Sequence, residues 1–240
     1  MEKIIDLSLI LPCYNEESIF KDSMQTITQL LNKTKYNYEI ILIDDQSKDN
    51  TPNLIKEIAK INPNIEYRLH TKNAGRGGVV MEGLKIARGK IAGYIDIDLE
   101  VPVENILSHA LAIENGYEIT YANRITKFEW HNIHRHIMHS IYIGLQKFLL
   151  QTKFNDTNAG CKFFNREKIL PILNECKETH WFWDTEILIR SYFHNLKLKE
   201  LPALYIPNSH KKSTVKKMSD TWYFIKKTME FRKIINQLKQ

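Results

Sequence analysis

Short apolar segments alternate with stretches of helical periodicity over the N-terminal part of this chain. The apolar segments lie at Leu7–Leu11, Glu39–Ile43, Ile65–His70 and Ile91–Ile95. Between them apolar residues recur three and four positions apart, a spacing that gathers them on one side of an α-helix. Strands that alternate with helices build βαβ units, in which the strands run parallel. The sequence therefore predicts an α/β fold with helices flanking a mostly parallel central sheet.

The C-terminal part is less regular but adds further elements. Strands are expected at Glu118–Ala122, Cys161–Phe164 and Leu198–Ile206, and helices at Ile133–Leu150 and Trp183–Phe193. Pro202 lies inside the last of these strands. Because proline has no N–H to donate to a neighbouring strand, it indicates an edge strand or a bulge.

Polar loops follow the first four strands. In parallel sheets, ligands bind beyond the carboxyl ends of the strands. The loops expected there contain Pro12–Glu16, Asp44–Asp45, the glycine-rich turn Asn73–Gly78, and the pair Asp96 and Asp98. Their convergence at one edge of the sheet predicts a ligand site there.

Asp96 and Asp98 should leave the tip of the fourth strand on the same face, because strand side chains alternate. Two carboxylates on one face attract a hard divalent cation, for which Mg²⁺ or Mn²⁺ is expected. Glu100 joins them if the extended geometry continues. The alternative is an acidic turn without a metal.

Four blocks of the sequence resemble the family 2 glycosyltransferases with the GT-A fold. Pro12–Glu16 is similar to P-x-Y-N-E, Ile43–Asp49 to V-D-D-x-S-x-D, Asn73–Gly77 to N-x-G-K/R-G, and Asp96–Asp98 stands at the D-x-D position. The resemblance extends from Leu9 to about Thr214. It implies a Rossmann-like GT-A domain that binds a nucleotide-sugar donor, with Asp96, Asp98 and Glu100 as the metal ligands.

Within this family the chain looks most like the dolichyl- and polyprenyl-phosphate sugar transferases, the group of dolichyl-phosphate mannose synthase. The similar segments are Asn123–Arg124, Asp156–Gly160 and Phe182–Glu186. Gln46 departs from the usual glycine or serine. The acceptor segments also depart from the pattern, and only Ser209–Thr214 and His139–Ser140 stand in their places.

Donor-binding residues are expected in the first three loops. Pro12, Tyr14 and Glu16 lie where a nucleotide base and ribose would rest, although Tyr14 could instead pack as an aromatic side chain and Glu16 could charge a helix N-terminus. Asp44 or Asp45 would accept a hydrogen bond from the base or the ribose, while the other could cap the next turn.

The glycine-rich turn is expected to approach the donor closely. Gly75 and Gly77 permit a near approach of the backbone, and Arg76 would meet the diphosphate. The alternative for Arg76 is an ordinary surface arginine. With a metal on Asp96 and Asp98 to neutralise the departing nucleoside diphosphate, the expected reaction is a single inverting displacement.

The chemistry of the acceptor decides whether a base is needed. A sugar hydroxyl requires a positioned carboxylate, whereas a lipid phosphate is already largely ionised and requires positioning. Arg124 suits a phosphate, or is a structural ion pair. Asp184 is a base, a ligand of the donor sugar, or a helix cap, and Glu186 is open to the same alternatives.

Acceptor-binding roles are assigned by resemblance to Arg124, His139, Lys211 and Ser213. His139 belongs to a cluster of histidines, which we interpret as an interfacial or acceptor-side face rather than as a metal site. The cluster comprises His131, His134, His136 and His139.

The chain has 240 residues and a net charge of +6, and we expect a transferase domain at 1–214 followed by a basic amphipathic helix at 215–240. An apolar stripe runs along that helix among lysines and arginines. Such a helix can lie in a bilayer surface, or it can pack on the domain or a partner. The stripe consists of Val215, Met218, Trp222, Ile225 and Met229.

The location follows from what the sequence does not contain. It shows no signal peptide, no apolar run long enough to span a membrane, and three widely spaced cysteines that suit a reducing compartment. We expect a cytoplasmic protein, peripheral on the inner face of the membrane, that reaches its acceptor directly or through a membrane partner subunit. Nucleic acid is not an expected partner, because no reader motif accompanies the positive charge.

The leading hypothesis is therefore a metal-dependent, inverting transfer of a hexose from a GDP- or UDP-linked sugar to polyprenyl or dolichyl phosphate. The alternative is a soluble family 2 enzyme that acts on a saccharide hydroxyl, with Asp184 as the base. A non-catalytic nucleotide-sugar-binding subunit is disfavoured because Asp96, Asp98, Arg124 and Asp184 occur together.

Overall fold

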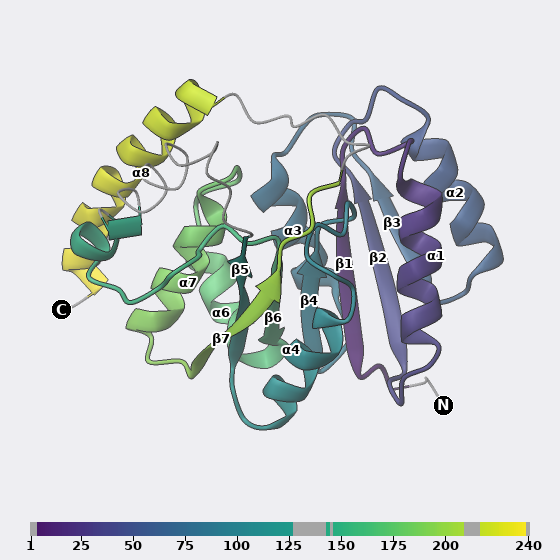
Figure 1. Cartoon of the computed structure of the whole chain (residues 1–240), viewed down its shortest axis with the longest axis horizontal. Coiled ribbons are helices and arrows are strands. Elements are labelled where there is room, and N and C mark those ends of the chain that lie inside the picture. Colours follow the sequence, from purple (N-terminus) through teal and green to yellow (C-terminus); the bar gives the residue numbers. More distant parts are fainter. Residues whose placement is uncertain (1–3, 127–142, 145, 209–216, 239–240) are drawn as a thin grey trace.

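The computed structural model describes residues 4–126, 143–144, 146–208 and 217–238. Their strands form one seven-stranded sheet in the order β3-β2-β1-β4-β6-β5-β7. β6 runs antiparallel to β4 and β5, and the other neighbours are parallel. The predicted mostly parallel α/β fold is confirmed (Figure 1). The strands are β1 (Leu7–Cys13), β2 (Tyr38–Asp44), β3 (Ile65–Leu69), β4 (Ile91–Ile95), β5 (Ile119–Ile125), β6 (Cys161–Asn165) and β7 (Leu198–Leu204).

Helices cover both faces of the sheet. Side chains of α1, α2 and α4 pack into the apolar core on one face, and those of α3, α6, α7 and α8 pack into the core on the other. Residues of β1 alternate between these cores, with Leu9 and Leu11 on the first side and Ile10 on the second. The helices are α1 (Phe20–Leu31), α2 (Thr51–Ile61), α3 (Arg76–Ile86), α4 (Asn105–Glu114), α6 (Arg166–Glu175), α7 (Trp183–Phe193) and α8 (Lys217–Leu238).

The central strands are apolar because helices bury them on both sides. All of β2 and β4 is buried, as a parallel strand between two helical layers must be. β7 lies at the edge of the sheet, as Pro202 predicts, and its side chains are mostly exposed or half-buried. Two helices, α4 and α6, are additional to those expected from the sequence.

The first two helices begin differently. α1 begins at Phe20, after a turn in which the N–H of Phe20 donates to the carbonyl of Glu16. α2 includes Thr51, so its N-cap residue is Asn50, and Pro52 lies in the first turn. The predicted helix at 133–150 lies largely outside the described residues, although 146–150 are helical.

α8 confirms the predicted C-terminal helix, but it packs on the domain through side chains that the sequence analysis did not select. Thr228, Phe231 and Ile235 are buried, and the Phe231 ring lies 5.8 Å from that of Phe182. Met229 of the predicted stripe is 49% exposed. The face that packs on the domain is therefore distinct from the stripe at this position. The expected boundary at residue 214 lies outside the described residues.

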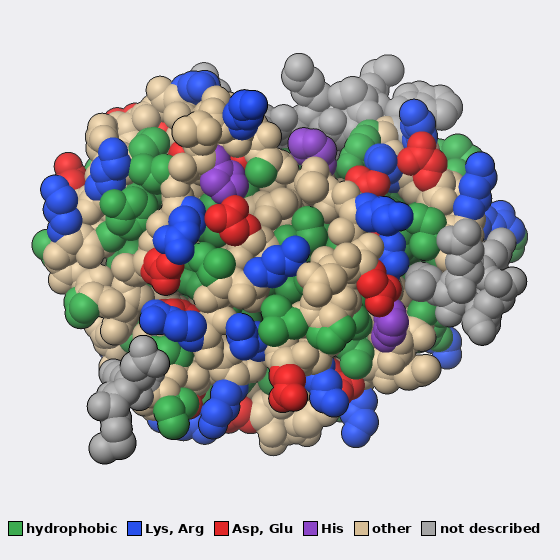
Figure 2. Space-filling model, turned by 180° about the vertical axis from the view of Figure 1, so that it is seen from behind, with side chains coloured by type: hydrophobic (Ala, Val, Ile, Leu, Met, Phe, Trp, Pro, Cys, Tyr) green, Lys and Arg blue, Asp and Glu red, His purple; other side chains and the backbone are tan. Residues whose placement is uncertain are grey.

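Charge on the molecular surface is mixed. On the face in Figure 2, the lysines and arginines of the described residues are interspersed with aspartates and glutamates. Among the described residues, no helix is long and apolar enough to cross a membrane.

Candidate active site at the carboxyl edge of the sheet

The loops after β1 and β2 are bonded directly to one another, as their expected convergence requires. The backbone N–H groups of Asn15 and Glu16 donate to the hydroxyls of Ser47 and Thr51, each at 2.8 Å. Asn15 has φ of +56°, a left-handed conformation that is uncommon for a residue other than glycine. These bonds set the course of the chain next to the predicted donor residues.

Three predicted donor residues lie in or beside the first loop. Pro12 is half-buried within β1, opposite Ile43 of β2. Tyr14 is 42% exposed, so it is not a packed core aromatic residue, whereas Glu16 is only 6% exposed. An exposed tyrosine at the end of β1 is available to contact a ligand.

Asp44 and Asp45 differ in how their carboxylates are engaged. Asp45 accepts the N–H groups of Ala74 at 2.6 Å and Gly75 at 3.0 Å, and therefore holds the glycine-rich turn. Asp44 accepts the N–H of Ser47 through Oδ2 at 3.0 Å. Its Oδ1 is buried and has no hydrogen-bond partner among the described residues. A buried carboxylate oxygen without a partner is costly, so Asp44 is the better candidate for a ligand contact.

The glycine-rich turn is covered by another part of the same chain. Gly75 has φ of +80°, and a Cβ there would lie 2.5 Å from the carbonyl oxygen of Thr179. The N–H of Gly78 donates to that same oxygen at 2.8 Å. The close backbone approach expected of this turn is thus made by the segment before α7, and Gly75 is not exposed to a ligand on that side.

The carboxylates after β4 face a small hollow. Asp96, Asp98 and Glu100 line it together with Arg124, and its volume is about 20 Å³, enough for one water molecule or ion. The remaining lining residues are Val101, Gly160 and Tyr205. The three residues that the sequence analysis selected as metal ligands therefore line one hollow, and their role as ligands stays a prediction.

The chemistry of these carboxylates fits a hard divalent cation, although Arg76 would compete with the cation for Asp96. Carboxylate oxygens are the donors that Mg²⁺ and Mn²⁺ prefer. Burial raises the pKa of Asp96, while Arg76 opposes this and Asp98 adds to it. Among the described residues, no three side chains of His, Cys, Asp or Glu lie close enough together to hold a metal ion as they stand, and Oδ1 of Asp96 is bonded by Arg76. Asp96, Asp98 and Glu100 are the residues that would hold the cation.

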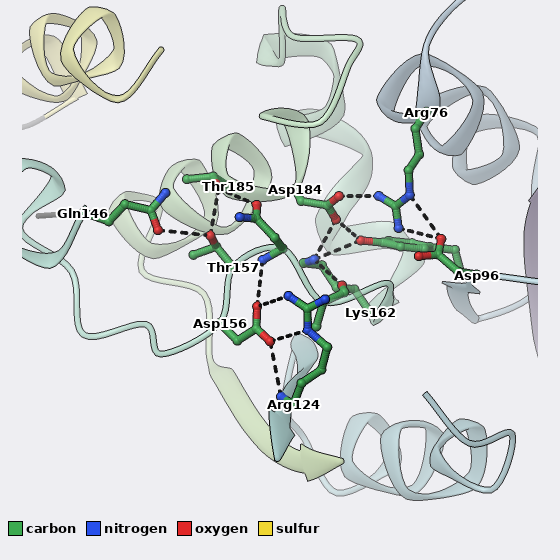
Figure 3. A network of polar contacts seen from close by, with 12 residues as sticks. Arg76, Asp96, Arg124, Gln146, Asp156, Thr157, Lys162, Asp184 and Thr185 are labelled. Atoms are coloured by element: carbon green, nitrogen blue, oxygen red, sulfur yellow. Dashed lines mark hydrogen bonds and ion pairs between the residues drawn. The ribbon is translucent and has the colours of Figure 1, made fainter. Parts of the chain in front are cut away.

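Arg76 joins the hollow to α7. Its Nε and Nη2 donate to Oδ1 of Asp96 at 3.1 and 2.7 Å, and its Nη1 donates to Asp184 (Figure 3). The guanidinium lies over the rings of Tyr94 and Trp181, 5.3 and 5.6 Å from their centres. Only 12% of the side chain is exposed, so Arg76 is not an ordinary surface arginine.

Lys162 is a part of this site that the sequence analysis missed. It is fully buried in β6, and its ammonium donates to Asp184 at 2.6 Å, to the carbonyl of Ala159 at 2.9 Å and to the hydroxyl of Tyr94 at 3.0 Å. These bonds use all three of its hydrogens. The available signal was a lysine inside the apolar segment Cys161–Phe164, since a lysine in a buried strand requires a partner.

Asp184 is enclosed by donors. Lys162 and the Tyr94 hydroxyl bond its Oδ1, and Arg76 bonds its Oδ2. Although burial alone would raise the pKa of Asp184, Arg76 and Lys162 hold it below its ordinary value. The N-cap position of α7 is Phe182, so Asp184 is not the helix cap. A carboxylate so engaged is a poor acceptor for a proton.

Glu186 lies apart from this network. Its carboxylate accepts hydrogen bonds from the backbone N–H groups of Lys177 and Glu178, which lie in the segment before α7. The bond from the N–H of Glu178 is 2.8 Å long. It also accepts Nε of Arg190 at 2.8 Å. Glu186 therefore holds that segment in place and makes no contact with Asp184 or Arg76 among these bonds.

Arg124 combines an ion pair with a place at the hollow. Its Nε and Nη2 donate to the two oxygens of Asp156 at 2.7 and 3.0 Å. Burial opposes ionisation of Asp156, but Arg124 lowers its pKa. The arginine side chain is still 29% exposed and lines the hollow. The pair thus fixes a guanidinium beside Asp98 and Glu100.

Comparison with known proteins identifies the family of this chain. The family model described as "Glycosyl transferase family 2" matches residues 8–172. This chain belongs to glycosyl transferase family 2. The match covers the loops that carry Tyr14, Asp44, Arg76 and Asp98, and it ends before α7.

Two curated relatives are similar over most of this chain. "Glycosyltransferase AglD" of Haloferax volcanii is 25% identical over 213 residues, which are 87% of this chain and 34% of that protein. "Dolichyl-phosphate beta-glucosyltransferase" of Dictyostelium discoideum is 28% identical over 214 residues, 82% of this chain and 65% of that protein. The chain spans 34% to 65% of the length of the first curated relatives that it matches.

A solved structure shows the same fold. Glucosyl-3-phosphoglycerate synthase from Mycobacterium tuberculosis, in complex with Mn²⁺, UDP and glucosyl-3-phosphoglycerate, has a TM-score of 0.67. The sequence identity is 14%, and the match covers 95% of this chain and 80% of that chain. At this identity the likeness concerns the fold, and it supports the GT-A architecture.

The remaining acceptor residues lie outside the described part of the chain. These are His139, Lys211 and Ser213, and the other histidines of the cluster lie there also. The chain that leads toward Lys211 nevertheless passes the hollow. The N–H of Ile206 donates to the backbone carbonyl of Glu100 at 2.9 Å, and the side-chain amide of Asn208 donates to the backbone carbonyl of Asp98 at 3.2 Å.

Proposed function

We propose that this chain transfers a hexose from a GDP- or UDP-linked sugar to polyprenyl or dolichyl phosphate at a membrane surface, with Mg²⁺ or Mn²⁺. Membership of family 2 supports sugar transfer. The dolichyl-phosphate β-glucosyltransferase relative supports a lipid phosphate acceptor, and the solved neighbour with Mn²⁺ and UDP supports the donor and the cation.

The ionisation of Asp184 is the observation that favours a phosphate acceptor over a hydroxyl acceptor. A hydroxyl acceptor needs a carboxylate that can take its proton. Asp184 is bonded by Lys162, Tyr94 and Arg76, which keep it ionised. An acceptor phosphate is already anionic and needs only a cationic group to orient it. Arg124, fixed beside the hollow, is such a group, and the saccharide-hydroxyl alternative with Asp184 as base is correspondingly less favoured.

Exposed apolar side chains at the ends of β5 and β7 support a lipid partner. Ile125 and Leu204 face one another across β5 and β7, and they are 52% and 62% exposed. Ile206, which is 56% exposed, follows on the same stretch of chain. We call these three residues the isoleucine–leucine ridge. Exposed apolar side chains on strands that end near the hollow offer a surface that a lipid chain could contact.

The donor half of the site is divided among separate loops. Tyr14 and Asp44 would contact the nucleoside, and Arg76 would contact the diphosphate. Asp96, Asp98 and Glu100 would hold the cation, which neutralises charge on the departing nucleoside diphosphate when it is bound. Association with the cytoplasmic face of the membrane, direct or through a partner subunit, completes the proposal.

A product assay tests this function. Purified protein is given UDP-glucose, UDP-galactose, GDP-mannose or GDP-glucose with polyprenyl phosphate in detergent and Mg²⁺ or Mn²⁺, and the organic phase is scored for acid-labile lipid-linked sugar. We expect product with one donor class, abolished by Asp98→Asn and retained by Asp22→Asn on the exposed face of α1. An acid-stable glycoside formed on an added saccharide, without lipid product, would favour the alternative instead.

A further inference from the structure

Four charged side chains form one chain of contacts from the cation hollow to β6. Asp96 pairs with Arg76, Arg76 with Asp184, and Asp184 with Lys162. Two carboxylates and two cations balance one another. Arg76 is the shared member, because its guanidinium bonds one carboxylate at each end (Figure 3).

Lys162 influences how the hydrogen bonds of Arg76 are distributed between Asp96 and Asp184. A fully buried ammonium must be paired, and Asp184 is its only carboxylate partner among the bonds that the described residues make. Because Lys162 neutralises much of the charge of Asp184, that carboxylate does not draw the guanidinium to itself alone. The Nε and Nη2 groups of Arg76 therefore remain on Asp96.

We propose that Lys162 is a positioning residue, which through Asp184 holds Arg76 on Asp96. A divalent cation then gains the carboxylate of Asp96 only when a diphosphate binds the guanidinium of Arg76 in its place. The inference rests on the proposed function, which makes Asp96 a cation ligand and Arg76 a diphosphate ligand. An arginine suits this exchange, because its planar fork binds carboxylate and phosphate with the same geometry.

The consequence is coupling between the cation and the donor. The free protein holds a cation weakly, since Arg76 competes for Asp96, and a nucleoside diphosphate strengthens cation binding by removing that competitor. Thermodynamic reciprocity requires that the cation strengthen nucleotide binding by the same factor.

Titration with Mn²⁺, followed by electron paramagnetic resonance of the free ion, tests the inference without turnover. Wild type, Lys162→Met and Arg76→Lys are titrated alone and with UDP or GDP. Both variants are expected to bind Mn²⁺ alone about 10-fold more tightly than wild type, the effect of one charge-assisted hydrogen bond, and to respond less to nucleotide. Arg76→Lys keeps the positive charge but loses the planar guanidinium that bonds both carboxylates. Tighter Mn²⁺ binding in this variant would therefore result from lost pairing with Asp96 rather than from lost charge.

A double variant separates positioning from general damage. In Lys162→Met with Asp184→Asn, the only carboxylate left to Arg76 in this network is Asp96, so weak Mn²⁺ binding should return. Damage to the fold would weaken Mn²⁺ binding in Lys162→Met, whereas the lost positioning of Arg76 is expected to tighten it. If Lys162→Met does not fold by circular dichroism, Lys162→Gln, which keeps an N–H for Asp184, takes its place with a smaller expected gain.

The outcomes distinguish the inference from the function on which it rests. Wild type that binds no Mn²⁺ even with UDP or GDP present overturns the proposed function. Nucleotide-coupled Mn²⁺ binding in wild type, with unchanged affinity in folded Lys162 and Arg76 variants, overturns only the positioning role.

Discussion

The Nζ of Lys162 lies 2.6 Å from Oδ1 of Asp184, and both side chains are buried. Lys162→Met is expected to destabilise the protein by about 3–5 kcal/mol, because it leaves Asp184 with one counter-ion fewer in the interior. Lys162→Met with Asp184→Asn should recover part of this loss, since both charges are then absent. Urea unfolding followed by circular dichroism gives both values, and additive losses in the double variant would contradict the expectation.

His109 makes stability depend on pH. It is buried on α4, with Nδ1 2.8 Å from the Thr120 hydroxyl, and burial and then the charge of Lys162 lower its pKa to about 3. The unfolded chain takes up a proton below its own pKa of 6.5, whereas the folded protein does not until about pH 3. The contribution of neutral His109 to the free energy of unfolding is therefore fully present above about pH 6.5. It is lost as the pH falls from there toward about pH 3.

The expected contribution of His109 between pH 7 and pH 5 is a loss of about 2 kcal/mol. His109→Leu should remove this part of the pH dependence and leave the rest. The measurement is the free energy of urea unfolding at both pH values for wild type and variant. The same pH dependence in both proteins would count against a neutral buried histidine.

Gly160 has no room for a side chain. A Cβ at this position would lie 1.8 Å from Oδ2 of Asp96, so Gly160→Ala must displace that carboxylate. Transferase activity should fall about 100-fold, the usual effect of a displacement of about 1 Å at a reacting site. Gly144→Ala is the matched control, because nothing lies within 4 Å of a Cβ there. Comparable activity of the two variants would contradict the assigned role of Asp96.

Asp44 and Asp45 should separate binding from stability. Asp45→Asn replaces one of the two acceptor oxygens by an NH₂ group, so it loses the bond to Ala74 or to Gly75, and a loss of about 1–3 kcal/mol is expected in thermal unfolding. Asp44→Asn should leave stability within about 1 kcal/mol and weaken nucleotide binding about 10-fold by calorimetry. The reverse pattern would exchange the two roles.

The isoleucine–leucine ridge should matter only for lipid. The double variant Ile125→Ser and Leu204→Ser is expected to lose binding to phosphatidylglycerol vesicles and to raise KM for a long polyprenyl phosphate. Its KM for a water-soluble short-chain phosphate should not change, because Arg124 is retained. Ile61→Ser, at an 82% exposed residue on α2, is the control. An equal effect on both acceptors would indicate damage to Arg124 rather than lost lipid contact.

Local patterns were enough to predict most of the fold. β4 begins and ends at the predicted residues, and α7 does also, because each has a clear apolar period and a clear boundary. The order of the strands, the antiparallel direction of β6 and the packing face of α8 were not predictable in this way. Each depends on contacts between segments that are far apart in the chain.

The sequence by itself determined the family and the edge of the sheet where Asp44, Arg76 and Asp96 would lie, since strand ends carry their loops to one side. Only the tertiary structure decided that Asp45 holds a turn while Asp44 keeps an unpaired oxygen. It also decided that Lys162, on the strand beside β4, reaches Asp184 on α7. A buried charge must be paired, but its partner is chosen by three-dimensional proximity, which no spacing along the chain records.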